Sequence, residues 1–362
     1  MSRPAPVRLA VIGAGMIGHR HAAAIAAAEG AVLACVVDPA EAGQRVAARH
    51  GVPCHPSIEA MVAAGGVDGA YLATPNQVHV EGALACLAAG LPLLVEKPIA
   101  TDVAGGRRIV AAAEAAGLPL ATGHHRRHNP LIARARALVA EGRIGQPVTV
   151  HGTTWFMKPD YYFDDPWRRQ AGAGPVFLNL IHDIDLLQSF CGRITEVSAM
   201  EARPVRGYAP EEAAVMILRF ETGVLGTVSV CDTVVAPWSW EMTARENPAY
   251  PATPEDCYRI AGTLGSLSLP NLALWTDGGA RDWWQPISAT RMAHDLADPL
   301  VAQAAQFARV IRDGEAPVVS GRDGLAALAV IEAVKRSAAN GARVRVDHDP
   351  APGAGVAAEV AP

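Results

Sequence analysis

The first third of the chain alternates two hydrophobic patterns. Short apolar runs of the kind that form buried strands are separated by alanine-rich stretches with helical spacing. The apolar runs lie at residues 8–12, 31–37, 67–73, 93–95 and 119–122. A strand, a helix and a parallel strand in regular order form right-handed βαβ units. The pattern therefore predicts an α/β fold that begins with a doubly wound parallel sheet of the Rossmann type.

The pattern changes in the second half of the chain. Between about residues 194 and 285, runs such as AAVMILRF and GVLGTVSVC alternate and turn frequently, which predicts an antiparallel sheet. Aromatic residues mark the same division, because Tyr71 is the only Phe, Trp or Tyr before Trp155. We predict a Rossmann domain over residues 1–124, an α+β domain over 125–350, and a disordered tail over 351–362 that is rich in Ala, Pro and Gly.

An amphipathic helix is predicted within the stretch PVFLNLIHDIDLLQSFCG, residues 175–192. Its apolar stripe consists of Leu180, Ile181, Ile184 and Leu187. Its polar arc consists of Asn179, His182 and Asp183, with Asp185 at the margin. Such an arc either faces solvent or presents a polar cluster to a site.

Composition excludes several classes of partner. The 362 residues carry a formal net charge of −5 and no long basic run, which argues against nucleic acid and anionic membrane surfaces. No apolar stretch reaches the roughly 18 residues of a membrane span. Six cysteines are scattered without a Cys-x-x-Cys pair, which favours a reducing cytoplasm over a disulfide framework. We expect a cytoplasmic protein with a small-molecule partner.

The first predicted strand leads into the glycine pattern GAGMIG, residues 13–18, and then into a helical stretch. Gly13 permits a tight turn, Gly15 lets the backbone approach a pyrophosphate, and Gly18 allows the helix to pack closely on the strand. The loop, including Met16 and Ile17, is therefore expected to bind a dinucleotide.

Asp38 ends the second predicted strand, twenty residues after Gly18. A carboxylate at this point can accept hydrogen bonds from both ribose hydroxyls and would repel a 2′-phosphate. The sequence therefore predicts NAD, rather than NADP, as the cofactor.

Polar side chains also follow the next two predicted strands. They are Thr74, Asn76 and His79 after one strand, and Glu96 and Lys97 after the other. Because open α/β sheets bind ligands at the carboxyl ends of their strands, we expect these residues to line the cofactor site. Two alternatives stay open: Asn76 could cap a helix over 78–89, and Lys97 could merely cap its strand. Lys97 is one of three lysines beside 28 arginines, and an ammonium can release its proton whereas a guanidinium cannot.

The segments VIGAGMIG, ATPNQVH and EKP, together with Asp38, resemble the glucose-fructose oxidoreductase/inositol dehydrogenase/MocA (Gfo/Idh/MocA) family over nearly the whole chain. The resemblance implies an NAD or NADP dehydrogenase that acts on a carbohydrate-like substrate. It also implies a catalytic Lys97 beside the nicotinamide and a cis peptide before Pro98. The second sheet is expected to be large and open, and covering its free face with a second subunit implies a homodimer or homotetramer.

The chain departs from the family pattern at Leu178. Family members often carry a glycine triplet and an Asp four residues before a catalytic His. This chain has Gly172-Ala173-Gly174 and His182, but Leu178 stands where the Asp is expected. Asn179 could serve instead, so the departure affects the expected substrate more than the expected reaction.

Candidate substrate ligands lie in the second domain, partly in the long loop over residues 157–174, and long loops are commonly functional. They are Arg127, Trp155, Trp167, Arg168, Asn179, His182 and Asp183. Packing of the loop onto its own domain is the competing explanation for its aromatic residues. No metal is predicted, since the histidines at 124, 125 and 128 lack a nearby carboxylate or thiolate and lie beside two arginines.

Together these features predict an NAD-dependent oxidoreductase acting on a sugar, an inositol or a related polyhydroxy or cyclic alcohol. Hydride would pass to nicotinamide C4 while Lys97 or His182 takes the hydroxyl proton. The choice stays open because burial would lower the pKa of Lys97 whereas Glu96 would raise it. The alternatives are a glycosidase that uses NAD without net redox change and a catalytically silent dinucleotide-binding regulator. The pairing of Lys97 with His182 argues against the regulator.

Overall fold

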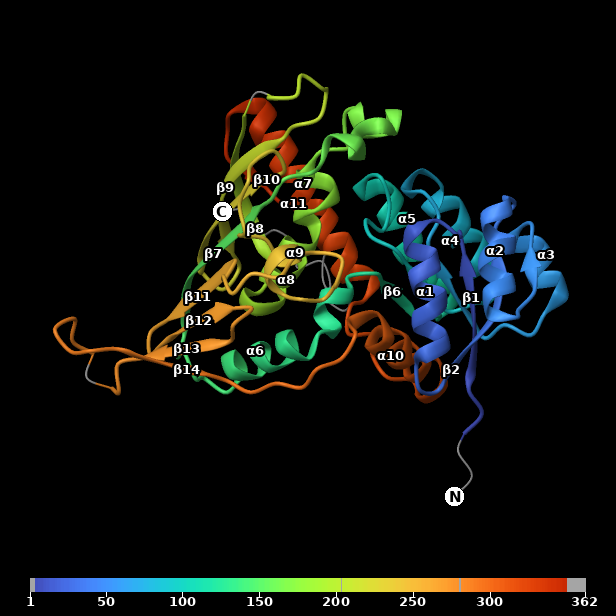
Figure 1. Cartoon of the computed structure of the whole chain (residues 1–362), viewed down its shortest axis with the longest axis horizontal. Coiled ribbons are helices and arrows are strands. Elements are labelled where there is room, and N and C mark those ends of the chain that lie inside the picture. The colour runs from blue at the N-terminus through green and yellow to red at the C-terminus, as the bar shows by residue number, and fades with distance from the viewer. Residues whose placement is uncertain (1–3, 203, 280, 350–362) are drawn as a thin grey trace, which may run out of the picture.

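The structure is a computed structural model that describes residues 4–202, 204–279 and 281–349, and it contains two domains side by side (Figure 1). The N-terminal domain holds the blue and cyan elements, and the second domain holds the green, yellow and orange strands. The tail predicted over 351–362 lies outside the described residues. Of the helices described, none is both long enough and apolar enough to cross a membrane.

The first domain is built on a parallel sheet. Within the described chain this sheet has six strands in the order β3-β2-β1-β4-β5-β6. The strands are β1 Val7–Ile12, β2 Ala31–Val37, β3 Cys54–His55, β4 Gly69–Leu72, β5 Leu93–Val95 and β6 Leu120–Thr122. All of their pairings are parallel, which confirms the predicted doubly wound sheet. The sequence did not predict β3, which at two residues is too short to leave a hydrophobic run.

Helices follow these strands in the chain. They are α1 Met16–Ala27, α2 Glu41–His50, α3 Ile58–Ala64, α4 His79–Ala88, preceded by the short η1 Asn76–Val78, and α5 Val103–Ala116. β1 lies between β2 and β4, so the chain leaves β1 on one side of the sheet and later returns on the other. Connections that diverge in this way open a crevice at the carboxyl ends of the strands, where such sheets bind ligands.

The second domain is built on a mostly antiparallel sheet, as predicted. Among the described residues it has nine strands in the order β14-β13-β12-β11-β7-β10-β9-β8-β15. They are β7 Pro147–Trp155, β8 Ile194–Glu201, β9 Ala213–Phe220, β10 Leu225–Cys231, β11 Tyr258–Gly262, β12 Ser266–Leu269, β13 Ala273–Thr276, β14 Ser288–Arg291 and β15 Val344–Arg345. Within this second sheet, as far as the structure describes it, only the pairing of β7 with β10 is parallel.

Helices cover one face of this second sheet (Figure 1). The helices beyond residue 124 are α6 Pro130–Ala140, α7 Pro175–Leu178, α8 Leu180–Cys191, α9 Trp240–Thr243, α10 Pro299–Asp313 and α11 Gly321–Asn340, with the short η2 His125–His128, η3 Asp160–Asp164 and η4 Pro166–Arg169. α11 packs on α8 and β8, and Ser337 of α11 accepts a hydrogen bond from Ala199 N at 2.9 Å.

The other face of the sheet is open. Burial alternates along β9, so that Ala214, Met216 and Leu218 are buried while Val215 and Ile217 are 53% and 60% exposed. Cross-strand neighbours share a face of a sheet, which places exposed apolar residues of other strands beside these two. They are Met200 of β8, paired with Val215, and Leu225 of β10, paired with Arg219.

The chain returns to the first domain before it ends. α10 packs on α1, β1 and β2, and the ring of Phe307 meets the edge of Tyr71 at 5.5 Å between centroids. Ser320 then bridges to Ala121 at the edge of β6. Part of the segment assigned to the second domain from sequence, residues 125–350, thus completes the core of the first domain.

Candidate active site

The glycine loop between β1 and α1 has the close contacts that its pattern predicts. Gly13 has a φ of 94°, and a Cβ there would lie 2.7 Å from the Ala73 oxygen. A Cβ on Gly18 would overlap the Gly13 carbonyl. A Cβ on Gly15, by contrast, would meet nothing within 4 Å, so the backbone before the amino end of α1 faces open space. The loop therefore offers unobstructed amides at a helix terminus, which suit a phosphate.

Asp38 lies directly after β2 and joins this loop. One carboxylate oxygen accepts a hydrogen bond from Ala14 N at 2.7 Å, and the other accepts from Ala40 N at 2.8 Å. The side chain is partly exposed. Because each carboxylate oxygen can accept more than one hydrogen bond, both remain able to accept from ribose hydroxyls.

The residues after β4 take different positions. Thr74 and Asn76 line a cleft between the domains. Asn76 does not cap the following helix, since α4 begins at His79 with Val78 at its N-cap and no side-chain cap bond. His79 is fully buried, and its ring nitrogens lie 2.9 Å from Pro98 O and 3.0 Å from Thr74 O. His79 therefore links the ends of β4 and β5 and is not among the residues that line the cleft. The sequence had instead predicted His79 as a cofactor-binding residue.

Glu96 and Lys97 follow β5. Glu96 is 5% exposed and accepts hydrogen bonds from the buried His21 at 2.7 Å and from Lys97 N at 2.9 Å. Burial alone would raise the pKa of Glu96, but the hydrogen bond and charge of His21, with Lys97, lower it to about 2. The carboxylate therefore remains ionised at the base of the cleft.

Lys97 extends from this base into the cleft. Its Nζ donates to the carbonyl oxygen of Leu178 at 3.0 Å, and its peptide bond to Pro98 is cis. Burial lowers the pKa of Lys97, the charge of Glu96 opposes this effect, and the charge of Arg126 adds to it. An ammonium with a lowered pKa is suited to proton exchange.

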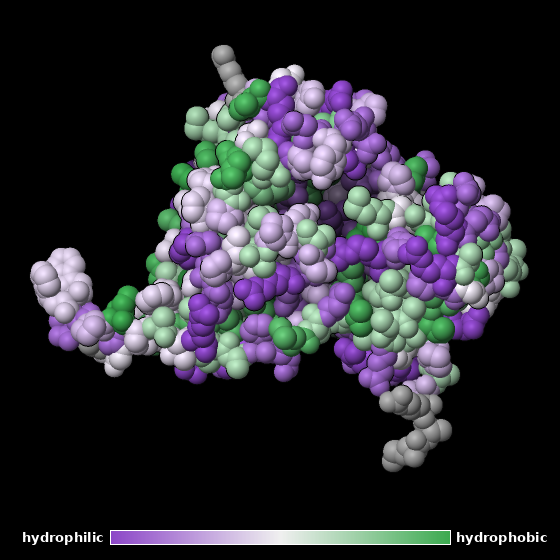
Figure 2. Space-filling view, in the orientation of Figure 1, coloured by the Kyte–Doolittle hydropathy of each residue, from purple (hydrophilic) through white to green (hydrophobic). Residues whose placement is uncertain are grey.

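The cleft has a volume of about 320 Å³ and lies where the two domains meet, at the hollow seen in Figure 2. Its first-domain wall consists of Ile17, Arg20, Thr74, Asn76, Glu96 and Lys97. Leu178, Asn179 and His182 line it from the second domain. A larger cavity of about 710 Å³ borders it but shares only Glu246 and Pro299 with it and contains neither Lys97 nor His182.

His182 comes from α8 and lines this cleft together with Lys97. It is 6% exposed, and its ring lies edge-on to those of His124 at 5.5 Å and His125 at 5.2 Å. Burial lowers the pKa of His182 well below its usual value, and the charges of Lys97 and Arg126 lower it further. Nδ1 of His182 and Oδ1 of Asn179 have no hydrogen-bond partner among the described residues. A neutral imidazole and an amide oxygen are therefore available to a ligand.

Asp183 does not reach the cleft, although the sequence grouped it with His182. It is fully buried and accepts hydrogen bonds from Arg126 at 2.8 Å, from Thr154 at 3.0 Å and from the Tyr258 hydroxyl. Burial raises the pKa of Asp183, and the charge of Arg126 opposes that rise. Residues on all faces of α8 are buried. The part of its polar arc that contains Asp183 therefore faces Arg126 inside the domain.

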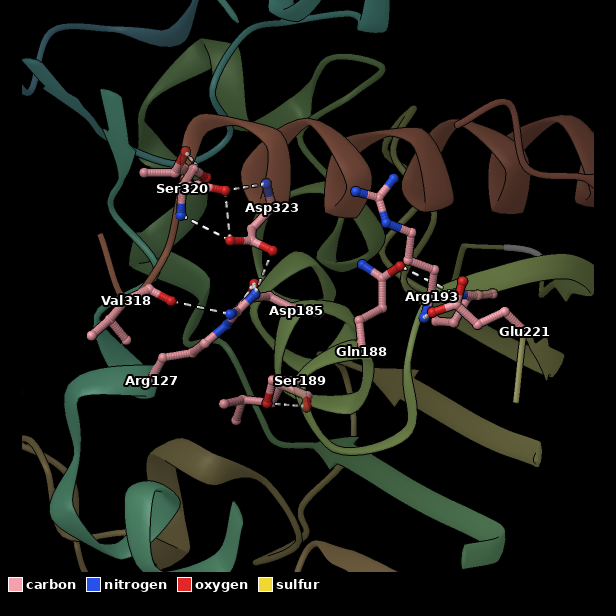
Figure 3. A network of polar contacts seen from close by, with 12 residues as sticks. Arg127, Asp185, Gln188, Ser189, Arg193, Glu221, Val318, Ser320 and Asp323 are labelled. Atoms are coloured by element: carbon pink, nitrogen blue, oxygen red, sulfur yellow. Dashed lines mark hydrogen bonds and ion pairs between the residues drawn. The ribbon is translucent and has the colours of Figure 1, made fainter. Parts of the chain in front are cut away.

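Arg127 also binds other side chains and does not line the cleft (Figure 3). The sequence had instead predicted Arg127 as a substrate ligand. Its guanidinium is 8% exposed and donates two hydrogen bonds, of 2.7 and 2.9 Å, to the Asp185 carboxylate. It also donates to Val318 O at 3.2 Å and lies 3.4 Å from Asp323, beside the start of α11. Arg127 therefore holds three parts of the chain together.

The three remaining aromatic and basic candidates also lie outside the cleft lining. Trp155 ends β7 on the open face of the sheet, where its indole donates to Ser229 at 2.7 Å. Trp167 is 48% exposed. The Arg168 guanidinium stacks 4.1 Å over the Tyr162 ring and donates to Tyr162 O at 2.7 Å. The loop over 157–174 thus packs on itself, and Phe163 also packs against Tyr208 of the same domain, as in the alternative that the sequence left open.

Sequence reasoning missed a large part of the cleft wall. The missed residues are Arg20, His125, Arg126, Trp240, Glu241, Glu246, Asn247 and Tyr250. Five of them lie between residues 240 and 250, in a segment with no motif and no clear periodicity. Its only signal was a mixture of acidic, amide and aromatic side chains in a connection of the second sheet. No group of three or more potential metal ligands occurs among the described residues.

Curated relatives match this chain over nearly its full length. A 1,5-anhydro-D-fructose reductase of Ensifer adhaerens is 29% identical over 94% of this chain and 98% of its own. An inositol 2-dehydrogenase of Streptomyces avermitilis is 29% identical over 95% of each chain.

Solved structures with the same fold include the WlbA dehydrogenase of Bordetella pertussis in complex with NADH and UDP-GlcNAcA. It is 27% identical, with a TM-score of 0.77 over 95% of this chain and 100% of that one. An oxidoreductase from Agrobacterium radiobacter, solved with NAD⁺, L-tartaric acid and magnesium, is 22% identical with a TM-score of 0.80 over 94% and 98%.

Two family models match successive parts of the chain. One describes an oxidoreductase family with an NAD-binding Rossmann fold and matches residues 7–124. The other describes the GFO/IDH/MocA C-terminal domain and matches residues 132–268. Together with the cleft that Lys97 and His182 share, these matches show that the chain belongs to the Gfo/Idh/MocA family of oxidoreductases.

Proposed function

We propose that this protein is an NAD-dependent dehydrogenase that transfers a hydride between a polyhydroxy or cyclic alcohol and the nicotinamide. The observation that carries the proposal is the cleft of about 320 Å³ that Lys97 of the first domain and His182 of the second both line. Relatives named inositol 2-dehydrogenase and 1,5-anhydro-D-fructose reductase support an alcohol or sugar as the substrate class.

The residues present fit a dinucleotide. Gly15 leaves the approach to the amino end of α1 unobstructed, which suits a pyrophosphate. Asp38 would accept the ribose hydroxyls, and Thr74 and Asn76 would adjoin the nicotinamide end together with Ile17. A carboxylate at Asp38 supports NAD over NADP because it would repel a 2′-phosphate. When bound, the nicotinamide supplies the acceptor for the hydride.

Lys97 is the proton acceptor in this proposal. Its lowered pKa favours a neutral amine that can take the hydroxyl proton at Nζ. The resulting ammonium is stabilised by the Leu178 carbonyl at 3.0 Å and by the ionised Glu96. His182 has a pKa well below its usual value and is a poorer site for the proton, so we assign it to orienting the hydroxyl by a hydrogen bond.

Variants of Lys97 test the assignment. Lys97→Ala should retain NAD binding and lose about 100-fold to 10,000-fold in turnover, the usual span for general acid–base catalysis. Lys97→Arg should not restore turnover, because a guanidinium does not release its proton. Lys335→Arg, outside the cleft, is the matched control and should keep wild-type turnover. The assay is NADH absorbance during oxidation of myo-inositol, D-glucose and 1,5-anhydro-D-glucitol.

Two outcomes would contradict the proposal. Full activity of Lys97→Arg would remove Lys97 from proton transfer. Release of product from a glycoside without accumulation of NADH would favour an NAD-using glycosidase instead. A variant His182→Ala separates the two roles, because loss of an orienting hydrogen bond mainly raises KM whereas loss of a proton acceptor lowers kcat.

We also propose that a second copy of the chain covers the open face of the nine-stranded sheet. Val215 and Ile217 expose more than half of their surface there, with the exposed Met200 and Leu225 on the neighbouring strands. Exposed apolar residues grouped in this way favour an interaction site. Two copies related by a two-fold axis would bury the same patch on each other.

A further inference from the structure

The segment Ser239–Tyr250 forms part of the second-domain side of the cleft that Lys97 lines. Ser239 caps the short helix α9 by accepting a hydrogen bond from Met242 N at 3.3 Å, and Trp240 anchors it with 2% exposure. The side chains of Glu241, Glu246 and Tyr250 from this segment line the cleft with Lys97 and His182. The segment therefore brings two carboxylates to a cleft that already holds the proposed proton acceptor, Lys97.

Glu241 is held in place by a chain of buried charges. One of its oxygens, Oε1, accepts a hydrogen bond from Arg126 at 2.7 Å, and the same guanidinium donates to Asp183 at 2.8 Å. The side chains of Arg126, Asp183 and Glu241 are 4%, 0% and 15% exposed. Arg126 also lies 5.8 Å above the Trp240 ring. Because Arg126 is hydrogen-bonded to both Asp183 and Glu241, it fixes the orientation of the Glu241 carboxylate.

The second oxygen of Glu241, Oε2, is buried and has no hydrogen-bond partner among the described residues. Glu246 differs, since its carboxylate accepts from Asn129 at 2.8 Å and lies 3.7 Å from His125. A buried acceptor without a partner costs about 1–3 kcal/mol. A ligand that donates a hydrogen bond to this oxygen would remove that cost, and Asn179 Oδ1 offers a second unpartnered acceptor on the same wall.

We propose that Glu241 determines substrate specificity by accepting a hydrogen bond from a second substrate hydroxyl, distinct from the one that Lys97 deprotonates. An ionised carboxylate is an acceptor only, so it binds a hydroxyl and repels a substrate with its own carboxylate at that position. The inference rests on the proposed dehydrogenase function and adds the requirement for this second hydroxyl.

The test compares parent polyols with monodeoxy analogues. Wild-type protein is assayed with NAD and myo-inositol, D-glucose or 1,5-anhydro-D-glucitol, and the parent that is oxidised is then compared with each of its monodeoxy derivatives. We expect one derivative to lose about 100-fold or more in kcat/KM, since a site built to bind a hydroxyl rejects the analogue that lacks it. In Glu241→Gln the ratio of kcat/KM between the parent and this derivative should fall below about 10-fold, because a neutral amide forms a weaker hydrogen bond with the hydroxyl than a carboxylate does.

Control variants separate recognition from structural support. Glu255→Gln changes an exposed carboxylate at the end of the same connection, bonded to the Trp238 indole, and should leave the ratio at its wild-type value. Glu241→Asp keeps the charge but shortens the side chain, so we expect a raised KM for the parent with a smaller change in kcat. If Glu241→Gln does not fold, the wild-type deoxy series and Glu241→Asp still decide the question.

Distinct results refute the inference and the function on which it rests. If Glu241→Gln lowers kcat/KM equally for the parent and every deoxy analogue, Glu241 acts only by supporting Arg126 and the inference is wrong. A wild-type penalty of less than about 3-fold at every position would also overturn it. If wild-type protein oxidises no polyol at all, the proposed dehydrogenase function fails instead.

Discussion

Replacing His124 should make the stability of this protein less sensitive to acid. His124 follows β6, is fully buried, and has no hydrogen-bond partner for either ring nitrogen among the described residues. Burial lowers the pKa of His124 from 6.5 to about 4, with Asp185 opposing and Arg127 reinforcing the effect. The folded protein therefore keeps this ring neutral under conditions in which the unfolded chain protonates it.

The sign and size of the effect follow from linkage. Between pH 6.5 and about 4 the unfolded state binds a proton that the folded state does not, so stability is complete above this window and falls as the pH falls through it. At about 1.4 kcal/mol per pKa unit the full loss is about 3 kcal/mol, of which about 2 kcal/mol accrues between pH 7.5 and pH 5. His124→Leu removes the titrating group without breaking a hydrogen bond.

The assay is urea unfolding of wild type and His124→Leu at pH 7.5 and pH 5, followed by circular dichroism. We expect the free energy of unfolding of wild type to fall by about 2 kcal/mol more than that of the variant over this interval. His294→Leu, a partly exposed histidine in the segment before α10, is the control and should behave like wild type. Equal losses for wild type and His124→Leu would show that the ring does not stay neutral in the folded protein.

Three further outcomes are expected. Asp38→Ser should weaken the preference for NAD over NADP by about 1–3 kcal/mol in titration calorimetry, and comparable affinities of wild type for both cofactors would contradict the role of this carboxylate. Asp185→Ala leaves Arg127 buried without its two-bond partner, so it should lower the free energy of unfolding by about 3–5 kcal/mol while KM of the folded protein stays unchanged. Ile217→Glu places a charge on the open sheet face and should shift sedimentation towards smaller species, whereas an unchanged sedimentation coefficient would exclude that face as the interface.

The sequence by itself determined the first domain and indicated two residues that line the cleft, Lys97 and His182. Apolar runs of three to seven residues separated by helical stretches have few ways to pack other than as a doubly wound sheet, and the observed strands lie at the predicted runs. The glycine loop, Asp38 and Lys97 were identifiable because each lies at a strand end, where local order already dictates position. His182 was identifiable because helical period places it on a polar arc.

Only the tertiary structure decided what that arc and its neighbours contact. The period showed that His182, Asp183 and Asp185 are polar positions of one helix, but it carried no information on what packs against them. Asp183 and Asp185 meet Arg126 and Arg127 across 57 and 58 residues of chain, and these partners keep both carboxylates out of the cleft.

The same reason explains the residues that the sequence missed or misplaced. Trp155 is an aromatic residue at a strand end, yet the pairing of β7 with β10 turns it to the open face of the sheet. Glu241 belongs to a connection without periodicity, and it becomes part of the cleft because Arg126, 115 residues earlier in the chain, holds it there. Local patterns determine which residues share an element, whereas contacts between distant segments determine which of them can reach a ligand.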